Sequence, residues 1–409
     1  MYLTPEQKAK GRRTFSRMAG GGTDLSRLKL GTVPEHITGG DPVRVGLVGP
    51  GSQGSTLLGH CLKLQELIEV EAICDVNPAH RAQASQLIAE AKGKPARQYE
   101  DWQEMAQKEK LDAVIIATPL WTHADITVGF LNAGSHVLCE KMMAYDAPSC
   151  RRMLEASQRN YRLLEIGYPR FYEPLYQAVY RNIMQPKVVG DIHFVRLHTH
   201  RNNSWRRTEK APSTDYNPQR WGYPTWDALA NWRLYKHYSQ GLVGELGSHQ
   251  TSLAEWYLGS TATSVYATGV IACYKDGREV NDHIYMTYSH PGGCTVELSV
   301  ILSNDYGGLY EEFVGSKGTL IVSDIDGGML FLNDEECGAD ARGRLVEDAS
   351  LPWSPDWNLA FRTEIWNFCS AIRHASPLLC GPQRAMASAI SALAGNQAVN
   401  ARGPVEIPV

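Results

Sequence analysis

The sequence lacks several features that define common classes of protein. No hydrophobic run approaches the roughly 20 residues that a membrane-spanning helix needs. The nine cysteines include no C-x-x-C pair, which argues against a structural zinc motif and a disulfide framework and favours a reducing compartment. The formal net charge is only −4, without a run of like charges. We therefore predict no metal, no membrane span and no nucleic-acid partner.

The N-terminus, residues 1–40, has a composition that predicts an arm. Arg12 and Arg13, followed by Thr14 and Phe15, resemble the start of a twin-arginine export signal. Such a signal continues into an apolar segment, whereas glycines and charged residues follow here. We therefore expect a mobile arm on a cytoplasmic protein, with a periplasmic location as the alternative.

Residues 41–168 alternate between short apolar strands and helical segments. The expected strands are rich in β-branched residues and cover 43–49, 69–75, 112–119, 135–141 and 162–168. Strands that alternate with helices of about 10–15 residues are typical of βαβ units. We therefore predict a doubly wound parallel sheet of the Rossmann type.

A glycine motif lies at the first strand-to-helix turn. Gly49, Gly51 and Gly54 are spaced as G-x-G-x-x-G, and Asp75 ends the next strand. Such glycines permit a tight turn, let a pyrophosphate approach the helix amides, and let the helix pack on the strand. A carboxylate at position 75 would bind the ribose hydroxyls and repel a 2′-phosphate, so we predict NAD rather than NADP. The other predicted cofactor contacts in this turn are Ser52 and Gln53.

Further polar residues follow the later strands, at the carboxyl edge where open α/β sheets bind ligands. Thr118 and Pro119 end one strand, and His123 begins the next helix. We predict that they line the cofactor site, although His123 could equally be a structural residue at a helix start. Glu140 and Lys141 end a later strand of the same sheet. A surface ion pair would contribute under about 1 kcal/mol, and we predict instead that this pair faces the cofactor crevice.

From residue 169 the pattern changes to alternating apolar and polar residues. The expected strands, separated by Gly, Asp and Asn turns, are 191–201, 262–274, 282–290, 294–303, 311–316, 318–324 and 328–332. They predict an open, mostly antiparallel sheet over 169–350, with a helix on one face and a homo-oligomer contact, dimer or tetramer, on the other. Residues 351–409 are expected to form helices that pack back near the nucleotide domain.

The stretch 201–238 is rich in Trp, Tyr and Arg. Flat aromatic faces with hydrogen-bond donors between them suit a sugar, and the acidic chain argues against nucleic acid. A protomer interface is the plainer alternative. The predicted substrate contacts are Asn231, Trp232, Arg233 and Tyr235, together with Tyr168 and Arg170 at the last strand end of the nucleotide domain.

From about residue 43 to the C-terminus these segments resemble the glucose–fructose oxidoreductase/inositol dehydrogenase family, Gfo/Idh/MocA. The motifs stand in the order of the family: GLVGPGSQG, AICDVNP, ATPLWTH, HVLCEKMMA, GLVGELGSHQTSLAEWYLG and EEFVGSKGTLIVSD. The resemblance implies that Lys141 hydrogen-bonds the reacting hydroxyl and touches the nicotinamide ribose. The family has Glu-Lys-Pro at this strand end, so Met142 departs from it and puts the local backbone geometry in question.

The resemblance also implies a second motif at the head of a helix in the second domain. The family has Asp and His four residues apart, and Glu245 and His249 hold these positions here, on one helical face. Alone, His249 would be interpreted as a structural histidine. Within the motif it is predicted to be the general base, because its reference pKa near 6.5 suits the task. Lys141 would stabilise the developing alkoxide, and Glu245 would orient the substrate or the imidazole.

Together these residues predict an NAD-dependent oxidoreductase that acts on a CH–OH group of a sugar or sugar derivative. The same site could instead hydrolyse glycosides by transient oxidation at C3, elimination, water addition and re-reduction, with tightly bound NAD. That route needs an additional base near C2, for which His198, His200 and Tyr235 are the candidates. A non-catalytic NAD-binding sensor is a third class, and it would not need Lys141 and His249 together.

Overall fold

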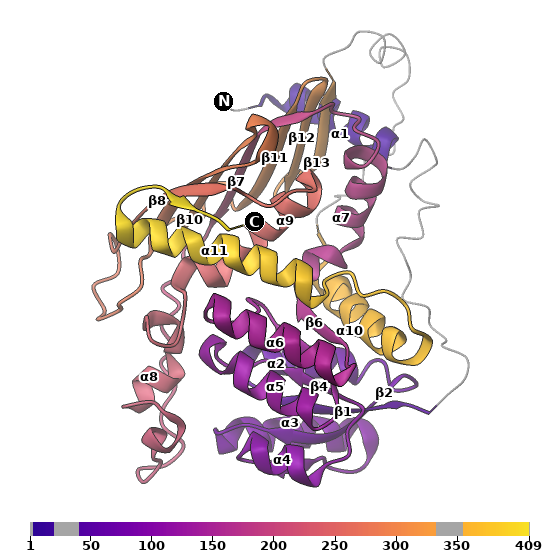
Figure 1. Ribbon diagram of the computed structural model, residues 1–409, viewed down its shortest axis with the longest axis vertical. Helices are drawn as coiled ribbons and strands as arrows, with labels where there is room; N and C mark the ends of the chain where they lie inside the picture. Colours follow the sequence, from indigo (N-terminus) through magenta and orange to yellow (C-terminus); the bar gives the residue numbers. More distant parts are fainter. Residues whose placement is uncertain (1–2, 20–40, 333–354, 409) are drawn as a thin grey trace.

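The computed structural model describes residues 3–19, 41–332 and 355–408 (Figure 1). Two sheets organise it, with the nucleotide-domain sheet in the lower half of Figure 1 and the second sheet in the upper half. The strands of the first sheet are β1 (Val43–Val48), β2 (Ile68–Cys74), β3 (Arg97–Tyr99), β4 (Ala113–Ile116), β5 (His136–Glu140) and β6 (Leu164–Gly167). Its helices are α2 (Ser52–Cys61), α3 (Pro78–Lys92), α4 (Trp102–Lys108), α5 (His123–Asn132) and α6 (Ala147–Asn160).

The first sheet is parallel throughout, in the order β3-β2-β1-β4-β5-β6. This is the strand order of a dinucleotide-binding doubly wound fold, in which the order reverses between β1 and β4. Ligands of such sheets bind outside the carboxyl ends of the strands at this reversal. The predicted Rossmann sheet is confirmed.

Local sequence signals explain where several of these helices begin and end. Asn77 caps α3, because its side chain accepts a hydrogen bond from the amide of Ala79 at 3.0 Å. Pro78 holds the first helical position, and Gly93 ends the helix with φ +74°. Asp146 caps α6 in the same manner as Asn77 caps α3.

The second sheet has eight strands in the order β13-β12-β11-β7-β10-β9-β8-β14. These strands are β7 (Ile192–His200), β8 (Ser264–Val270), β9 (His283–Ser289), β10 (Thr295–Ile301), β11 (Leu309–Gly315), β12 (Gly318–Ser323), β13 (Gly327–Leu332) and β14 (Val405–Glu406). Only β7 and β10 pair in parallel. The predicted open, mostly antiparallel sheet is therefore also confirmed.

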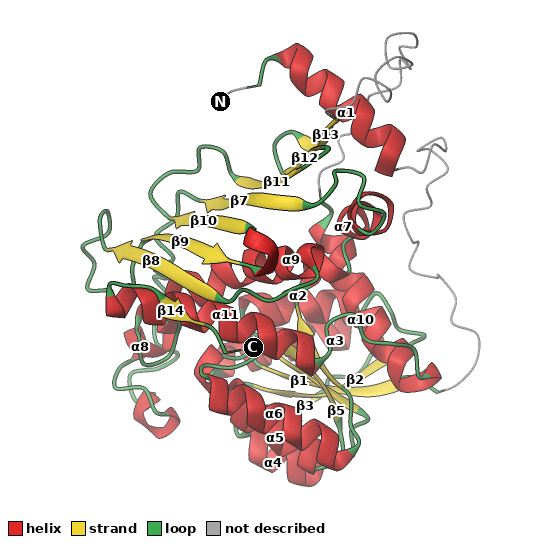
Figure 2. Cartoon of the chain, turned by 45° about the horizontal axis from the view of Figure 1, so that its top comes forward, coloured by secondary structure: helices red, strands yellow, loops and turns green. Residues whose placement is uncertain are grey.

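Helix α9 (Ser248–Leu258) covers the inner face of this sheet, and its other face is open (Figure 2). Alternate residues of β10, such as Val296 and Leu298, are buried toward the inner face. On the opposite face Tyr266 and Tyr285 are each 49% exposed. The hydrophobic core of this half therefore lies between the sheet and α9.

The remaining helices connect the two halves. They are α7 (Pro174–Val179), α8 (Trp226–Ala230), α10 (Trp357–His374) and α11 (Pro382–Ala401). Phe368 and Cys369 of α10 share a buried cluster with Leu57 and Leu58 of α2, so α10 packs against the nucleotide domain. Helix α11 crosses between the halves and contacts α6, α9 and β8 (Figure 1). The C-terminal helices thus pack back near the nucleotide domain as expected.

The N-terminal segment differs from the expected mobile arm. Residues Pro5–Ala19 form helix α1, which packs on the edge strand β13. Phe15 is 1% exposed and lies against Gly328, where an added Cβ would come within 2.3 Å of the ring. Arg12 pairs with Asp326 at 2.9 Å, and the rest of the expected arm, 20–40, lies outside the described residues. Across the part of the chain that the structure describes, no helix is long and apolar enough to cross a membrane.

The aromatic stretch 201–238 is used in part to join the two halves. The ring of Trp121, from the nucleotide domain, contacts Tyr223 and Tyr238 and donates a hydrogen bond to the Tyr223 hydroxyl at 2.7 Å. The Tyr216 hydroxyl donates to the carbonyl of Val76 at 3.1 Å. These side chains pack within the molecule, so this part of the stretch joins the two halves of the chain, a role that we did not predict.

Candidate active site

The glycine turn between β1 and α2 fits a dinucleotide pyrophosphate. Gly49 has φ +87°, which favours glycine, and a Cβ at Gly54 would lie 2.1 Å from the carbonyl oxygen of Gly49. A Cβ at Gly51 would meet only the ring of His80, at 3.6 Å. Open space therefore remains beside the N-terminus of α2, whose first amides have no side-chain cap. Amides and a helix dipole directed into such space suit a phosphate group.

Asp75 lies at the end of β2 with both carboxylate oxygens in hydrogen bonds. One accepts from the amide of Asn77 at 2.7 Å, and the other contacts Nδ1 of His80 at 3.1 Å. The hydrogen bond to Asp75 raises the pKa of His80 above its ordinary value. Our sequence analysis did not identify His80 as a site residue. Its place in the first turn of the helix after Asp75 was the available signal.

His123 braces the two loops that follow β4 and β5. Its Nε2 lies 2.9 Å from the carbonyl of Thr118, which precedes Pro119, and its Nδ1 lies 3.0 Å from the carbonyl of Met142. The residue is 2% exposed, and this burial lowers its pKa. A buried ring that lies between these two carbonyls and donates to one of them positions the loops, so the geometry favours the structural alternative for His123.

Glu140 connects the end of β5 to the glycine turn. One of its oxygens accepts a hydrogen bond from Nε2 of Gln53 at 2.7 Å, and the other accepts from the amide of Lys141 at 3.2 Å. Burial raises the pKa of Glu140, while Lys141 and Gln53 oppose the rise. The peptide bond between Lys141 and Met142 is cis. Glu140 therefore orients neighbouring groups from within the protein, and Lys141 extends away from the sheet.

Lys141 reaches across to the second domain. Its Nζ donates a hydrogen bond to the backbone carbonyl of Glu245 at 2.7 Å. Burial lowers the pKa of Lys141, and the carboxylates of Glu245 and Glu140 counteract this effect. This contact places the lysine at the start of the segment that leads into α9.

Glu245 does not lie on the regular helix that we predicted. It belongs to a π-helical turn, Val243–Gly247, that precedes α9. Its carboxylate accepts a hydrogen bond from Nε of Arg233 at 2.7 Å. Burial alone would raise the pKa of Glu245, but Arg233 and Lys141 lower it below its ordinary value. Glu245 is therefore an ionised group that holds Arg233 beside Lys141.

His249 follows in the first turn of α9. The ring of Tyr168 meets it edge-on, with centroids 5.8 Å apart. Within the described residues Nδ1 of His249 has no hydrogen-bond partner. Burial, together with the cations of Lys141, Arg170 and Arg201, lowers the pKa of His249 well below 6.5. The imidazole is therefore neutral at pH 7 and can accept a proton.

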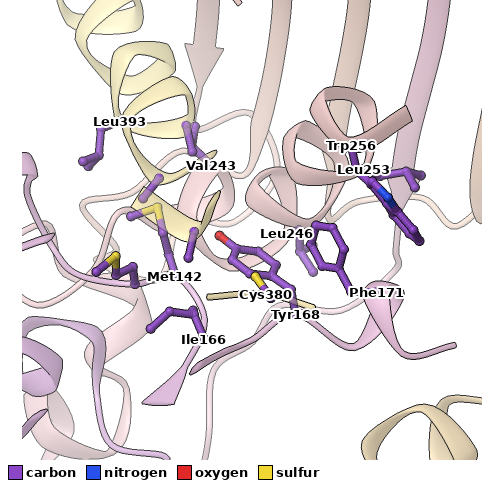
Figure 3. Close-up of a cluster of buried hydrophobic side chains, with 14 of the residues drawn as sticks. Met142, Ile166, Tyr168, Phe171, Val243, Leu246, Leu253, Trp256, Cys380 and Leu393 are labelled. Atoms are coloured by element: carbon purple, nitrogen blue, oxygen red, sulfur yellow. The ribbon is translucent and has the colours of Figure 1, made fainter. Parts of the chain in front are cut away.

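A buried apolar cluster fixes these polar groups relative to one another (Figure 3). Met142 enters it from the loop after Lys141, Tyr168 from the end of β6, and Val243 and Leu246 from the π-helical turn. Met142 is 1% exposed, so the residue that departs from the family motif packs in the core between the two halves. The loop that carries the lysine and the helix that carries the histidine are thus held by a shared core.

Most of the predicted substrate contacts are engaged with other protein groups. Buried Arg170 pairs with Glu311 at 3.1 Å. The ring of Trp232 stacks beneath the Arg233 guanidinium, and the central guanidinium carbon lies 4.4 Å from the centroid of the Trp232 ring. Asn231 and Tyr235 are also occupied, because the Asn231 side chain bonds the backbone of Arg207 and the Tyr235 hydroxyl donates to Asp227. Tyr168, beneath His249, is fully buried.

Two histidines proposed as an additional base lie on the wrong face of the second sheet. Between them in β7, Thr199 faces inward, because its hydroxyl accepts a hydrogen bond from Gln250 of α9 at 3.0 Å. Alternation along a strand directs His198 and His200 to the open face. They stack on each other there, with centroids 4.4 Å apart. Neither can act beside His249, so this expectation was wrong.

These features define an NAD-binding Rossmann domain joined to a second domain that completes the site. The sequence matches two domain families, "Oxidoreductase family, NAD-binding Rossmann fold" over residues 43–168 and "Oxidoreductase family, C-terminal alpha/beta domain" over residues 185–407. The chain therefore belongs to the Gfo/Idh/MocA oxidoreductase family, and its cofactor is NAD. The resemblance found in the motifs is confirmed.

Curated relatives support the same family. Inositol 2-dehydrogenase of Salmonella typhimurium is 34% identical over 149 residues, which cover 36% of this chain and 43% of that protein. The match thus spans less than half the length of that relative. Inositol 2-dehydrogenase 2 of Saccharopolyspora erythraea is 25% identical over 280 residues, 68% of this chain and 72% of that protein.

Solved structures share the fold over nearly the whole chain. The WlbA dehydrogenase of Bordetella pertussis, crystallised with NADH and UDP-GlcNAcA, gives a TM-score of 0.71 at 20% identity and covers 90% of this chain and 99% of that chain. Scyllo-inositol dehydrogenase of Lactobacillus casei, crystallised with NAD(H) and scyllo-inositol, gives a TM-score of 0.68 at 18% identity. This match covers 90% of this chain and 99% of that chain. At these identities the likeness is one of fold.

Proposed function

We propose that the chain is an NAD-dependent dehydrogenase that oxidises a secondary alcohol of an inositol or sugar derivative. The observation that carries this proposal is the hydrogen bond from Lys141 to the carbonyl of Glu245. It brings the lysine to the head of α9, where His249 offers a neutral imidazole. The partial match to inositol 2-dehydrogenases supports a polyol substrate.

The residues divide the reaction between them. Bound NAD supplies the acceptor for the hydride, and Gly49, Gly51, Gly54 and Asp75 would hold it. As the C–H bond breaks, the substrate hydroxyl loses its proton to His249, which leaves a ketone. Lys141 donates a hydrogen bond to the same oxygen and stabilises the negative charge that develops on it.

The charges of Arg233 and Glu245 support this arrangement. The carboxylate of Glu245 keeps Arg233 in place, and its backbone carbonyl anchors the Lys141 ammonium. Arg233 and Arg201 favour the neutral form of Lys141, and the two glutamates favour the charged form. Glu245 is thus proposed as a positioning residue for the lysine and Arg233.

Kinetics of a His249→Asn variant test the proposal. NADH formation is followed with a panel of inositols and sugars. We expect kcat to fall roughly 10²-fold or more. In the wild type, kcat/KM should fall with decreasing pH only below 6.5, because cations and burial lower the pKa of His249; in His249→Asn this acid limb should be absent. His374→Asn, at an exposed position of α10, is the matched control.

Three outcomes would contradict the proposal. Near-normal turnover by His249→Asn would exclude the histidine as the base. Release of aglycone from aryl glycosides without net NADH would show that the protein cleaves glycosides instead. If the wild type turns over neither a polyol nor a glycoside, the protein binds NAD but lacks the proposed dehydrogenase activity.

We further propose that the open face of the second sheet pairs two copies of the chain. Half-exposed Tyr266, Val270 and Tyr285 lie together on β8 and β9 of that face. Exposed apolar side chains grouped on a sheet commonly mark a contact between proteins. Light scattering after gel filtration should give a molecular mass of at least a dimer, and Tyr285→Glu should shift this mass toward that of a monomer. An unchanged mass in the variant would exclude this face of the sheet as the contact between copies.

A further inference from the structure

Charged side chains of both signs surround the proposed reacting groups. The cations are Lys141, Arg170, Arg201, Arg207 and Arg233, and the carboxylates that act on them are Glu140, Glu209, Glu245, Glu311 and Asp324. Glu311 pairs with Arg170, Glu245 pairs with Arg233, and Glu209 lies 3.9 Å from Arg207. Among these arginines of the described residues, only Arg201 has no ion pair.

Arg201 lies on the same side of the second sheet as α9. It follows β7 directly, and its amide continues the sheet by donating to the carbonyl of Ile301 at 3.0 Å. Two residues earlier, Thr199 faces α9 and bonds Gln250, the residue after His249. Alternation therefore directs Arg201 toward α9 as well. Consistent with this, the Arg201 charge lowers the pKa of both His249 and Lys141.

The Arg201 guanidinium has no carboxylate within ion-pair distance among the described residues. The acid that acts on its charge, Asp324, already accepts a hydrogen bond from the amide of Leu309 at 3.0 Å. The Arg201 side chain is exposed to solvent and can therefore meet a ligand. An arginine that has no ion pair in the described residues, beside two catalytic candidates, suits an anionic ligand group.

Arg207 is held near the same place. Its backbone is fixed on both sides by Asn231, which accepts from the Arg207 amide at 2.6 Å and donates to its carbonyl at 3.2 Å. Its charge acts on Arg233, and the only carboxylate paired with it in the described residues is Glu209, at 3.9 Å. Asn231, predicted as a substrate contact, thus positions an arginine instead.

We propose that the substrate of this site is an acidic sugar derivative, whose carboxylate or phosphate binds Arg201 with support from Arg207. This inference rests on the proposed dehydrogenase function and adds the charge of its substrate. A neutral polyol would leave the Arg201 guanidinium without a charged partner, whereas an anionic group would pair with it through charge-assisted hydrogen bonds. The guanidinium fork matches the oxygens of either anion.

Calorimetric titration of the NADH-loaded protein tests the charge directly. The ligands are matched sets that differ in one group: glucose, glucuronate and glucose 6-phosphate, and galactose with galacturonate, with myo-inositol as a neutral reference. At least one acidic ligand should bind roughly 10- to 100-fold more tightly than its neutral counterpart, the range expected of a hydrogen bond to a charged group. The arms with glucuronate and glucose 6-phosphate separate a carboxylate from a phosphate.

Variants assign the preference to the arginine. Arg201→Gln should remove most of the acidic preference, and Arg201→Lys should restore part of it. Arg159→Gln, the same change on the exposed side of α6, is the control and should retain the preference. Increasing salt should weaken only the acidic ligands.

The outcomes separate this inference from the proposed function. If no acidic ligand binds more tightly than its neutral counterpart, or if Arg201→Gln retains the full preference, the inference is wrong. Oxidation of myo-inositol in that case would leave the dehydrogenase intact. If an acidic ligand binds through Arg201 but no ligand yields NADH, the dehydrogenase proposal is wrong and the assignment of the anionic ligand holds.

Discussion

The helix after the glycine turn offers three Gly→Ala substitutions that separate folding from cofactor binding. A Cβ at Gly54 would lie 2.1 Å from the carbonyl oxygen of Gly49, whereas ordinary contacts begin near 3.4 Å. Helix and strand must therefore separate by more than about 1 Å, an overpacking that typically costs about 1–3 kcal/mol. At Gly59, in the same helix, no atom lies within 4 Å.

These geometries give different expected results for the three variants. Gly54→Ala should lower the Tm by roughly 2–12 °C, because about 1 kcal/mol shifts it by roughly 2–4 °C. Gly59→Ala should raise it slightly, because alanine is the better helix former by about 0.5–1 kcal/mol. Gly51→Ala should change it little, because its methyl group would make an ordinary contact with His80 at 3.6 Å.

Affinity for NAD should follow a different order. The methyl group of Gly51→Ala occupies the space assigned to the pyrophosphate, so the Kd should rise at least about tenfold, equivalent to 1.4 kcal/mol. Gly59→Ala should bind NAD as the wild type does. Scanning calorimetry and titration with NADH measure the two quantities. Wild-type affinity in Gly51→Ala, or equal stability of the 54 and 59 variants, would refute the reasoning.

Two further predictions concern stability away from the site. Phe15→Ala should lower the free energy of unfolding by about 3–5 kcal/mol, because it removes a buried ring, and should release α1. The release should appear as faster hydrogen exchange in Pro5–Ala19, with unchanged NAD affinity. Arg13→Ala, at an exposed position, is the control, and unchanged exchange in both variants would contradict the docking of α1. Burial raises the pKa of Glu165 well above 4.5, and neither carboxylate oxygen has a partner in the described residues. The free energy of unfolding should therefore fall as the pH rises from 4.5 through the folded-state pKa, by about 1.4 kcal/mol per unit of pKa shift. In urea titrations Glu165→Gln should be more stable than the wild type at pH 8 but not at pH 4.5. Glu155→Gln, at an exposed position, is the control and should show no such dependence on pH. An equal difference in stability between Glu165→Gln and the wild type at both pH values would exclude this explanation.

The parts of the fold set by local pattern could be predicted from sequence. The G-x-G-x-x-G turn and Asp75 follow one strand, one turn and one helix, so their relation depends on few contacts. The alternation in 294–303 and its neighbours likewise predicts a sheet whatever packs on it. The class of fold and the place of the cofactor therefore follow from short segments.

The features that we missed depend on how distant segments meet. His198 and His200 were placed near the substrate because alternation does not say which face of a strand meets α9, and a one-residue change reverses the answer. The π-helical turn at Val243–Gly247 has no periodic signature. Phe15 packs against Gly328, 313 positions away, and a glycine-rich and charged context conceals this contact in the sequence.

The partner of Lys141 is a backbone carbonyl, and this has a consequence for sequence drift. Every residue at position 245 would supply that oxygen, so this hydrogen bond does not depend on which side chain stands there. The charge of the lysine does depend on it, because the Glu245 carboxylate favours the ammonium form. Glutamate can therefore replace the aspartate of the family motif, since it keeps both the carbonyl and the carboxylate, provided that the path of the turn is kept. For chimaeras between relatives, matching the backbone of Val243–Gly247 matters more to this hydrogen bond than matching its residues.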